Sequence, residues 1–222
     1  MHYEGPQDTD LENVKALNEA FLSFLQRSPD AREHLRGLHE DLARRLISLT
    51  SRQRQRLAEA PFLLFSFRER DERFWRATFE SNPHQDLFPV TRPLPDDLSL
   101  LVAAGLGFVW QLARQNPYTL RLLCGASVHW CEQLADHTLM ELLNFATASD
   151  RLLVIRLEDK AEIWTKLLYS GVHHHMEVRR AAQLSVLQTV LTQVEKTSAL
   201  RWASAACRMT VPAMKVADEN NV

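Results

Sequence analysis

Hydrophobic and polar residues recur along most of this chain with the spacing of amphipathic α-helices. In residues 10–26, Val14, Leu17 and Phe21 follow one another at intervals of three and four, and leucines repeat that spacing through residues 30–49. Such intervals place apolar side chains on one face of a helix. The same pattern or its start and stop signals predict further helices at 50–60, 68–79, 138–148, 158–170, 177–194 and 197–209. The pattern therefore favours an all-α fold.

Three short stretches have the sequence of a capping box, in which a Ser or Thr precedes a Glu or Gln by three residues. They are Thr9–Glu12, Thr50–Gln53 and Ser66–Glu69. In this motif the two side chains satisfy main-chain N–H groups that the first helical turn leaves unpaired. Each stretch therefore predicts the start of a helix.

The most apolar part of the chain lies between Asp96 and Asp136. Residues 98–113 carry no charge, and Asn116-Pro117 then opens a second apolar helix to about residue 135. A helix that is apolar all round lies in a protein core or in a membrane, and a membrane span needs roughly 20 apolar residues. Because the first run is shorter than this, we interpret the pair as a buried helical hairpin, with a strand as the competing interpretation of the first run.

These elements predict an all-α helical bundle of seven to nine helices around a buried central helical hairpin. Residues 1–80 form an N-terminal helical subdomain, 81–97 a proline-rich connector, 98–210 a C-terminal helical subdomain with the hairpin, and 211–222 a tail, all within one compact domain. Two stretches fit this scheme less well. Residues 62–65 are expected to be extended, and 152–157 (LLVIRL) have strand character but no evident partner, so we interpret them as a helix or a buried connector.

Composition and charge narrow the class of protein. The 222 residues are 45% hydrophobic and 24% charged, with a formal net charge of -2, which gives no global attraction to nucleic acid or anionic membranes. The three cysteines, Cys124, Cys131 and Cys207, are an odd number without disulfide spacing, and the polar N-terminus lacks the features of a signal peptide. We therefore expect a cytoplasmic protein that is not associated with a membrane.

Residues with catalytic or metal-binding potential have simpler explanations. The run His173–His175 lies in an expected exposed turn, and neighbouring side chains diverge too much to share one ion. His129 falls on the solvent side of its predicted helix, whereas Cys124 and Cys131 fall on the apolar side. Glu69 and its acidic neighbours alternate with arginines, as on a solvated helix face. No phosphate-binding loop or hydrolase motif is present in the sequence. We expect no cofactor and no metal, and enzymatic activity is the least favoured function.

One stretch combines arginine with aromatic residues and is the candidate partner-binding surface. Its members are Arg52, Arg54, Arg56, Phe65, Phe67, Arg68, Arg70 and Trp75. Arginine and aromatic residues are enriched at protein interfaces, and together they can also bind single-stranded nucleic acid. For most of these aromatic side chains, however, the favoured interpretation is that they are core residues and that the arginines form the solvated rim of that core.

The sequence thus favours a non-catalytic cytoplasmic protein-interaction, regulatory or adaptor protein, or a subunit of a larger assembly, with a protein as its partner. The alternative is a nucleic-acid-binding regulator that uses the arginine-rich and aromatic N-terminal surface. The third possibility is an enzyme whose site is built from residues distant in sequence.

Overall fold

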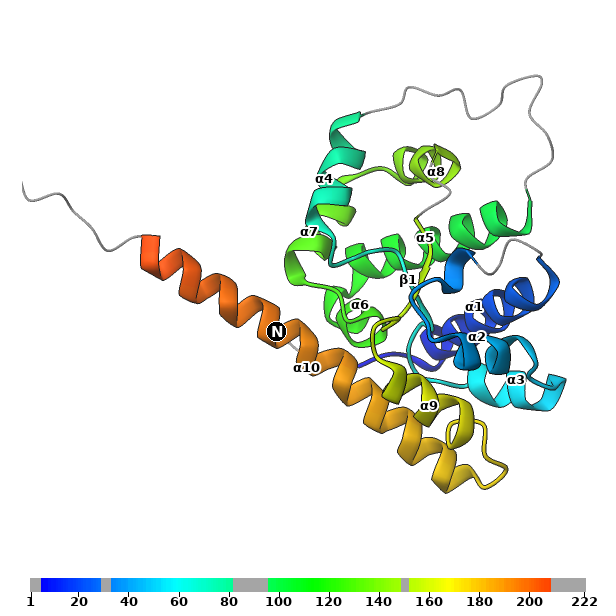
Figure 1. Ribbon diagram of the computed structural model, residues 1–222. Helices are drawn as coiled ribbons and strands as arrows, with labels where there is room; N and C mark the ends of the chain where they lie inside the picture. Colours follow the sequence, from blue (N-terminus) through cyan, green and yellow to red (C-terminus); the bar gives the residue numbers. More distant parts are fainter. Residues whose placement is uncertain (1–4, 29–32, 82–95, 149–151, 209–222) are drawn as a thin grey trace, which may run out of the picture.

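The computed structural model describes residues 5–28, 33–81, 96–148 and 152–208, and this part of the chain forms ten helices and one two-stranded sheet (Figure 1). The all-α prediction is confirmed. In chain order the elements are α1 (Asp8–Arg27), α2 (Glu40–Ile47), α3 (Ser51–Ala58), β1 (Phe65–Ser66), α4 (Glu72–Ser81), α5 (Asp97–Gln115), α6 (Pro117–Cys124), α7 (Val128–Asp136), α8 (Leu139–Ala148), β2 (Val154–Ile155), α9 (Ala161–Tyr169) and α10 (Met176–Arg208).

Helix α5 occupies the centre of the helical body and packs against α1, α6, α7 and α8. Asp96 caps it, accepting a hydrogen bond from the main-chain N–H of Ser99 at 2.7 Å. Leu106 and Val109 are completely buried, as expected of a core helix. Length and composition alone would also allow α5 to cross a membrane. In the fold it is instead the helix around which the others pack.

The second helix of the predicted hairpin is divided in two, which raises the number of helices above the expected seven to nine. Gly125 ends α6 in the left-handed conformation, with φ of 63°. Ser127 then caps α7 by accepting a hydrogen bond from the N–H of Trp130. A glycine at positive φ is a strong helix stop, and serine is a favoured N-cap. The prediction of one continuous helix over residues 117–135 was therefore wrong.

The N-terminal helices confirm some boundaries and correct others. Thr50 and Gln53 form the predicted capping box at the start of α3. Helix α1 begins earlier than expected and is capped by Gln7 and Asp10. A single helix over residues 30–49 was wrong, because the chain bends before α2. Gly37 lies in that bend, where a Cβ would come within 2.4 Å of a Glu158 carboxylate oxygen.

A non-helical segment of residues 60–66 runs through the core of this helical protein, and its main-chain polar groups need partners there. Asn18, buried in α1, supplies several of them. Its side-chain amide donates to the carbonyl of Phe62 at 2.9 Å, and its side-chain oxygen accepts from the N–H of Leu64 at 2.9 Å. The segment ends in β1, which pairs with β2 in antiparallel register, Phe65 opposite Ile155. Residues 152–157 therefore contain a strand, and the helix interpretation was wrong.

Two further expectations are corrected at α4 and α10. The capping box Ser66–Glu69 does not start a helix, because Glu69 turns into the core and α4 begins only at Glu72. The two helices predicted over 177–194 and 197–209 are one, α10. Leu184 is 58% exposed, although it was expected to face inward, and Val186 and Val190 are the buried residues of this part of α10 instead.

Residues 82–95 of the predicted connector, and the tail, lie outside the described residues, so the division into subdomains stays a prediction.

Candidate functional site

The aromatic members of the predicted partner-binding surface lie in the core. Phe65, Phe67 and Trp75 are at most 2% exposed. The rings of Phe65 and Phe67 meet edge to face with centroids 5.4 Å apart, and the indole N–H of Trp75 donates to the carbonyl of Phe67 at 3.0 Å. The structure thus brings these three side chains together, but as core residues that present no face to a partner or a base.

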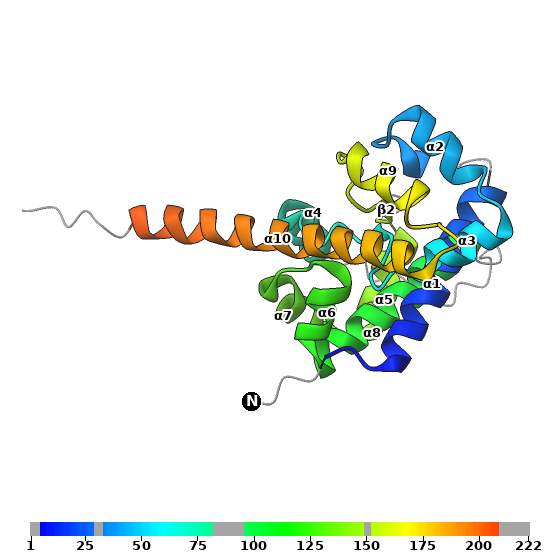
Figure 2. The same ribbon diagram turned by 90° about the horizontal axis from the view of Figure 1, so that it is seen from below.

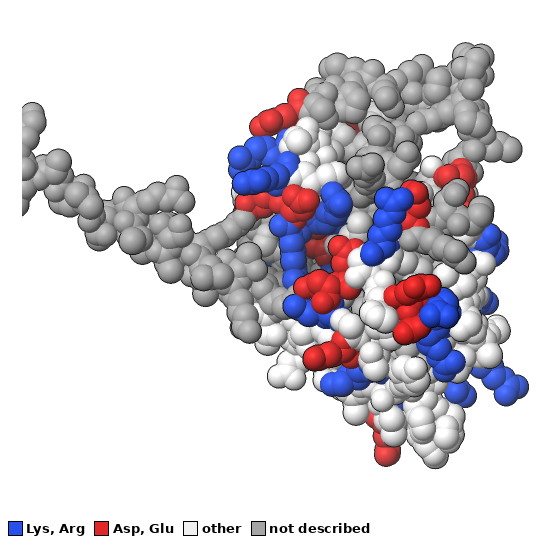
Figure 3. Space-filling model, viewed as in Figure 1, with Lys and Arg blue, Asp and Glu red and all other residues white. Residues whose placement is uncertain are grey.

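The arginines of that surface do not form one basic field. Arg54 donates to the side-chain oxygen of Gln26, and Arg68 forms an ion pair with Asp71 at 3.7 Å, whereas Arg52 is exposed on α3. On the face shown in Figure 3, acidic and basic side chains are interspersed. Arg52, Arg54 and Arg68 therefore lie at the solvated rim of the core, and they do not form a continuous phosphate-binding surface.

The two remaining arginines of the predicted surface, Arg56 and Arg70, both donate hydrogen bonds to main-chain carbonyls in α10 or in the turn before it. Arg56 donates to the carbonyl of Val172, in the turn before α10, at 3.3 Å. Arg70 donates to the carbonyl of Val190, within α10, at 3.1 Å. Desolvation lowers the pKa of Arg70, an effect that the charge of Glu69 partly offsets. These contacts direct attention from the predicted surface to the helix on which they converge.

Helix α10 is held on the body by a small set of contacts, which we call the α10 seat. At its outer end Gly125 approaches Val190 so closely that a Cβ on the glycine would lie 2.6 Å from a Val190 methyl group. Towards its start, buried Gln183 donates to the carbonyl of Arg56 at 3.1 Å. Arg179 forms an ion pair with Glu59 at 3.0 Å. Together with Arg70, these residues fix the first half of α10 against α3 and the end of α6.

Beyond Val190, α10 continues to Arg208 and leaves the body. Figures 1 and 2, which view the molecule from directions 90° apart, both show this part extending well past the other helices. We call residues 191–208 the projecting segment. At about 1.5 Å per residue it reaches roughly 27 Å beyond the seat. The α10 seat and the projecting segment together are the candidate functional site.

Beneath the seat lies a buried ionic cluster that the sequence did not reveal, which we call the Arg156 hub. The guanidinium of Arg156 forms an ion pair with Glu69 at 2.5 Å, and both side chains are at most 5% exposed. It also donates to the carbonyls of Leu63 at 2.6 Å, Phe65 at 2.7 Å and Cys124. A buried charge needs such partners, and here one arginine joins β1, β2 and the end of α6.

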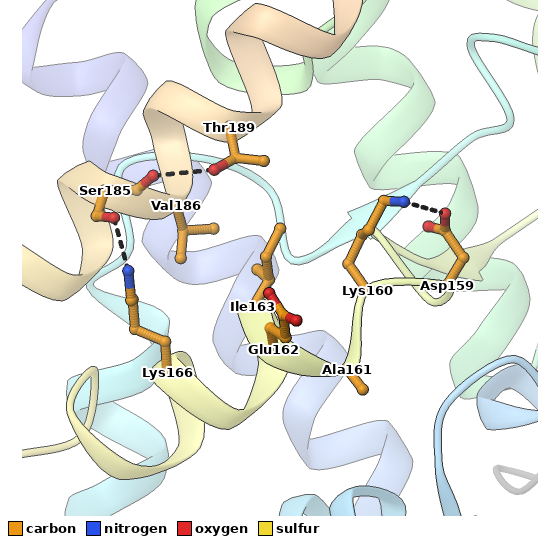
Figure 4. Close-up of a pocket in the computed structure, with 9 residues that line it drawn as sticks. All are labelled: Asp159, Lys160, Ala161, Glu162, Ile163, Lys166, Ser185, Val186 and Thr189. Atoms are coloured by element: carbon orange, nitrogen blue, oxygen red, sulfur yellow. Dashed lines mark hydrogen bonds and ion pairs between the residues drawn. The ribbon is translucent and has the colours of Figure 1, made fainter.

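A groove of about 660 Å³ with mixed polar and apolar lining lies between α9 and the first half of α10 (Figure 4). Ile163 and Val186 contribute apolar side chains to it. Lys166 spans the groove and donates to the hydroxyl of Ser185 at 2.9 Å, while Lys160 pairs with Asp159 at 3.0 Å. Because both lysines contact groups of this chain, we interpret the groove as part of the contact between α9 and α10.

The cysteine and histidine candidates lie where the sequence predicted, whereas Glu69, which was expected on a solvated helix face, is buried and paired with Arg156. Burial raises the pKa of the Cys124 thiol and raises that of Cys131 to about 12, while His129 is exposed. Residues 173–175 lie in a bend just before α10, and the charge of His175 lowers the pKa of His174. In the described part of the chain, no group of three or more His, Cys, Asp or Glu side chains is arranged to hold a metal ion.

Comparisons with protein-family models, with curated proteins and with solved structures found no match to this chain.

Proposed function

We propose that this chain is a non-catalytic cytoplasmic interaction protein, either an adaptor or a subunit of a larger assembly, that presents α10 to a protein partner. The observation that carries the proposal is the course of α10, which the body holds as far as Val190 and which then projects to Arg208. The seat fixes the direction in which the projecting segment leaves the body.

Helix energetics explain why a projecting helix indicates a partner. Most helices in proteins gain their stability from packing of an apolar face rather than from intrinsic propensity. The projecting segment contains Val194, Leu200 and Trp202 among its polar residues. Packing it against another surface would stabilise the helix and bury apolar residues. An amphipathic helix laid along a partner is a common form of recognition.

The proposal is tested by interrupting the projecting segment in the full chain. Ala199→Pro lies in the middle of it, and a proline inside a helix costs about 3 kcal/mol of local stability. We expect proteins recovered quantitatively with the wild-type chain from cells to be lost with Ala199→Pro, while thermal unfolding of the body is unchanged.

Arg52→Ala is the matched surface control, because Arg52 is exposed on α3, far from the projecting segment in sequence. It should recover the same proteins as the wild-type chain. Equal recovery with Ala199→Pro would argue against α10 as the interaction element. Loss with Arg52→Ala together with salt-sensitive retention on heparin would favour the nucleic-acid alternative.

A further inference from the structure

We infer that the three histidines in the bend before α10 make the α10 seat sensitive to acid, and that their protonation loosens the start of the helix. The inference rests on the proposed role of α10 as an interaction element and concerns the regulation of that element. Three features support it: the packing of the three rings, the hydrogen bonds that tie the bend to the seat, and the charges of the surrounding groups.

The rings of His173, His174 and His175 lie against one another. The ring centroids are 4.3 Å apart for the first two, 4.0 Å for the last two and 5.3 Å for the outer two. Neutral imidazole rings can pack in this way, whereas imidazolium rings at such distances repel one another. Because the charge of histidine changes near neutral pH, the cluster is more favourable at neutral pH than in acid.

A hydrogen bond within the bend also depends on a neutral ring. The main-chain N–H of His175 donates to Nδ1 of His173 at 3.1 Å. Nδ1 accepts a hydrogen bond only while it is unprotonated, because both ring nitrogens of a charged histidine are donors. The carbonyl of His175 in turn accepts from the N–H of Arg179 in α10 at 3.2 Å. Protonation of His173 therefore removes a contact that shapes the start of the helix.

The bend is tied to the seat by three consecutive main-chain carbonyls, each of which accepts a hydrogen bond from a side chain of α3 or α10. The carbonyls of Gly171, Val172 and His173 accept, in that order, from Gln183, Arg56 and Arg179, at 3.5, 3.3 and 3.1 Å. Arg179 also forms the ion pair of the seat with Glu59. Opening of the bend moves these carbonyls away from their donors, and it therefore weakens the seat at the start of α10.

The positive groups around the bend oppose protonation of the rings. The charge of His175 lowers the pKa of His174, and the charges of His173 and Arg56 act in the same direction. The bend also lies at the N-terminus of α10, where the helix dipole disfavours a cation. The folded bend therefore favours neutral histidines.

Carboxylates on the neighbouring helices offset this effect only in part. Glu59 of α3 is engaged with Arg179 at 3.0 Å. Glu177 is exposed in the first turn of α10, and Arg180, exposed on the same helix, has the charge of the protonated rings. Because water and salt screen an exposed carboxylate, Glu177 opposes the repulsion among the rings weakly.

Acid should consequently destabilise the bend. A lowered pKa means that the folded chain binds fewer protons at His174 than the unfolded chain does. The folded state loses stability as the pH falls through the ordinary histidine value of 6.5, and the loss is complete below the folded-state pKa. The loosening should be local, because Gly125 and Arg70 hold α10 further along, at Val190.

Hydrogen exchange of the full chain at two pH values tests the inference. After correction for the intrinsic pH dependence of exchange, protection of residues 179–183 should fall about threefold or more between about pH 7.5 and pH 5.5. Protection of β1 and β2 should stay unchanged. The combined substitution His173→Asn, His174→Gln and His175→Gln removes the three titrating rings, and asparagine keeps a side-chain oxygen that can accept from the N–H two residues on. This variant should show no such fall.

His129→Gln is the matched control, because His129 is an exposed histidine on α7, outside the bend. It should keep the wild-type loss of protection. A fall of the same size in the chain without the three histidines would overturn the inference, because acid would then act through other groups. Unchanged protection of residues 179–183 in the wild-type chain would also overturn it.

Failure of this inference is distinguishable from failure of the proposed function. Capture of partner proteins at about pH 7.5, and its loss with Ala199→Pro, tests the function alone. If capture is lost with Ala199→Pro but protection of residues 179–183 does not change with pH, α10 remains the interaction element and the histidines do not regulate it. Acid loosening in a chain that captures no protein would retain the regulation of the seat and remove the proposed function.

Discussion

The Arg156 hub and the α10 seat use similar chemistry in different surroundings. Arg156 donates to three main-chain carbonyls and to a buried carboxylate. At the seat, Arg70 donates to one carbonyl of α10, and Arg179 pairs with a carboxylate that is 39% exposed. Removing one partner of a buried ion pair lowers the stability of a protein far more than removing one partner of an exposed ion pair. The hub therefore defines the fold, whereas the seat holds α10 by contacts that can be altered without unfolding the body.

The largest effect is expected from Arg156→Met, which breaks the hub. The substitution fills similar space but leaves the Glu69 carboxylate buried without its cation and three carbonyls without their donor. Breaking a buried ion pair in this way costs about 3–5 kcal/mol. Urea unfolding followed by circular dichroism should show a loss of that size in the free energy of unfolding.

A comparison with an exposed arginine separates this effect from the loss of positive charge alone. Arg52→Ala should change the free energy of unfolding by no more than about 0.5 kcal/mol, as is usual for surface positions. A loss of less than about 1 kcal/mol with Arg156→Met would mean that the hub is not the main polar determinant of the interior.

Gly125→Ala should have the next largest effect, and it acts on the seat. The φ of 63° disfavours any residue with a Cβ by roughly 1–2 kcal/mol, and the new methyl group would also press on Val190, 2.6 Å away. We expect a loss of about 2–3 kcal/mol in the free energy of unfolding and faster amide hydrogen exchange in residues 182–190.

Gly107→Ala is the matched control, because Gly107 lies inside α5 and a Cβ there would meet, among the described residues, only Leu139, at 4.0 Å. Alanine is the better helix former, so this change should stabilise the protein by about 0.5–1 kcal/mol. If both variants lost stability equally, neither the left-handed turn nor the Val190 contact at Gly125 would explain the result.

The sequence predicted the elements of this fold much better than its buried polar contacts. Apolar periodicity located α1, the uncharged apolar run located α5, and the Thr50–Gln53 box located α3, because these signals are local. Strand β2 was missed because its partner, β1, lies far away in the sequence. Two signals could have indicated the interior contacts: Arg156 interrupts an apolar run, and Asn18 lies between Val14 and Phe21 on the buried face of α1.

The candidate site was predicted less well, for a related reason. Residue types identified the stretch containing Phe65, Phe67 and Trp75, but they could not show whether the aromatic residues face solvent, and the structure buries them. Arg56 and Arg70 contact α10 and the turn before it through residues that lie more than 100 positions away in the sequence. The projection of α10 depends on which part of the helix packs against the other helices, and local sequence patterns do not indicate this.

A smaller, pH-dependent effect is expected at Asp96, the N-cap of α5. Hydrogen bonds from Ser99 lower the pKa of Asp96 below its usual 3.8. A carboxylate with a lowered pKa stabilises the folded state above the pKa of the unfolded chain, and this contribution is lost as the pH falls through the folded-state pKa. Asp96→Ala should therefore cost about 1 kcal/mol at neutral pH.

The pH dependence of the difference identifies its cause. The free energy of unfolding should be measured for both chains from pH 7 downwards, and the gap between them should narrow as the pH falls through the folded-state pKa, which lies below 3.8. Asp96→Asn, which keeps a capping oxygen without the charge, should remove only part of the stability. A gap that stayed constant down to acidic pH would point to lost packing at the start of α5.

The smallest effect should come from Glu59→Gln, which weakens the ion pair of the seat while leaving the hub intact. The two groups are 3.0 Å apart, with Arg179 13% and Glu59 39% exposed. Partly exposed pairs contribute about 0.2–1 kcal/mol and are screened by salt, so the loss should shrink as ionic strength rises. Hydrogen exchange should quicken at the start of α10 and not in β1 or β2. If instead exchange quickened equally in the sheet, the seat and the hub would be one cooperative unit, and α10 could not move independently of the fold that carries it.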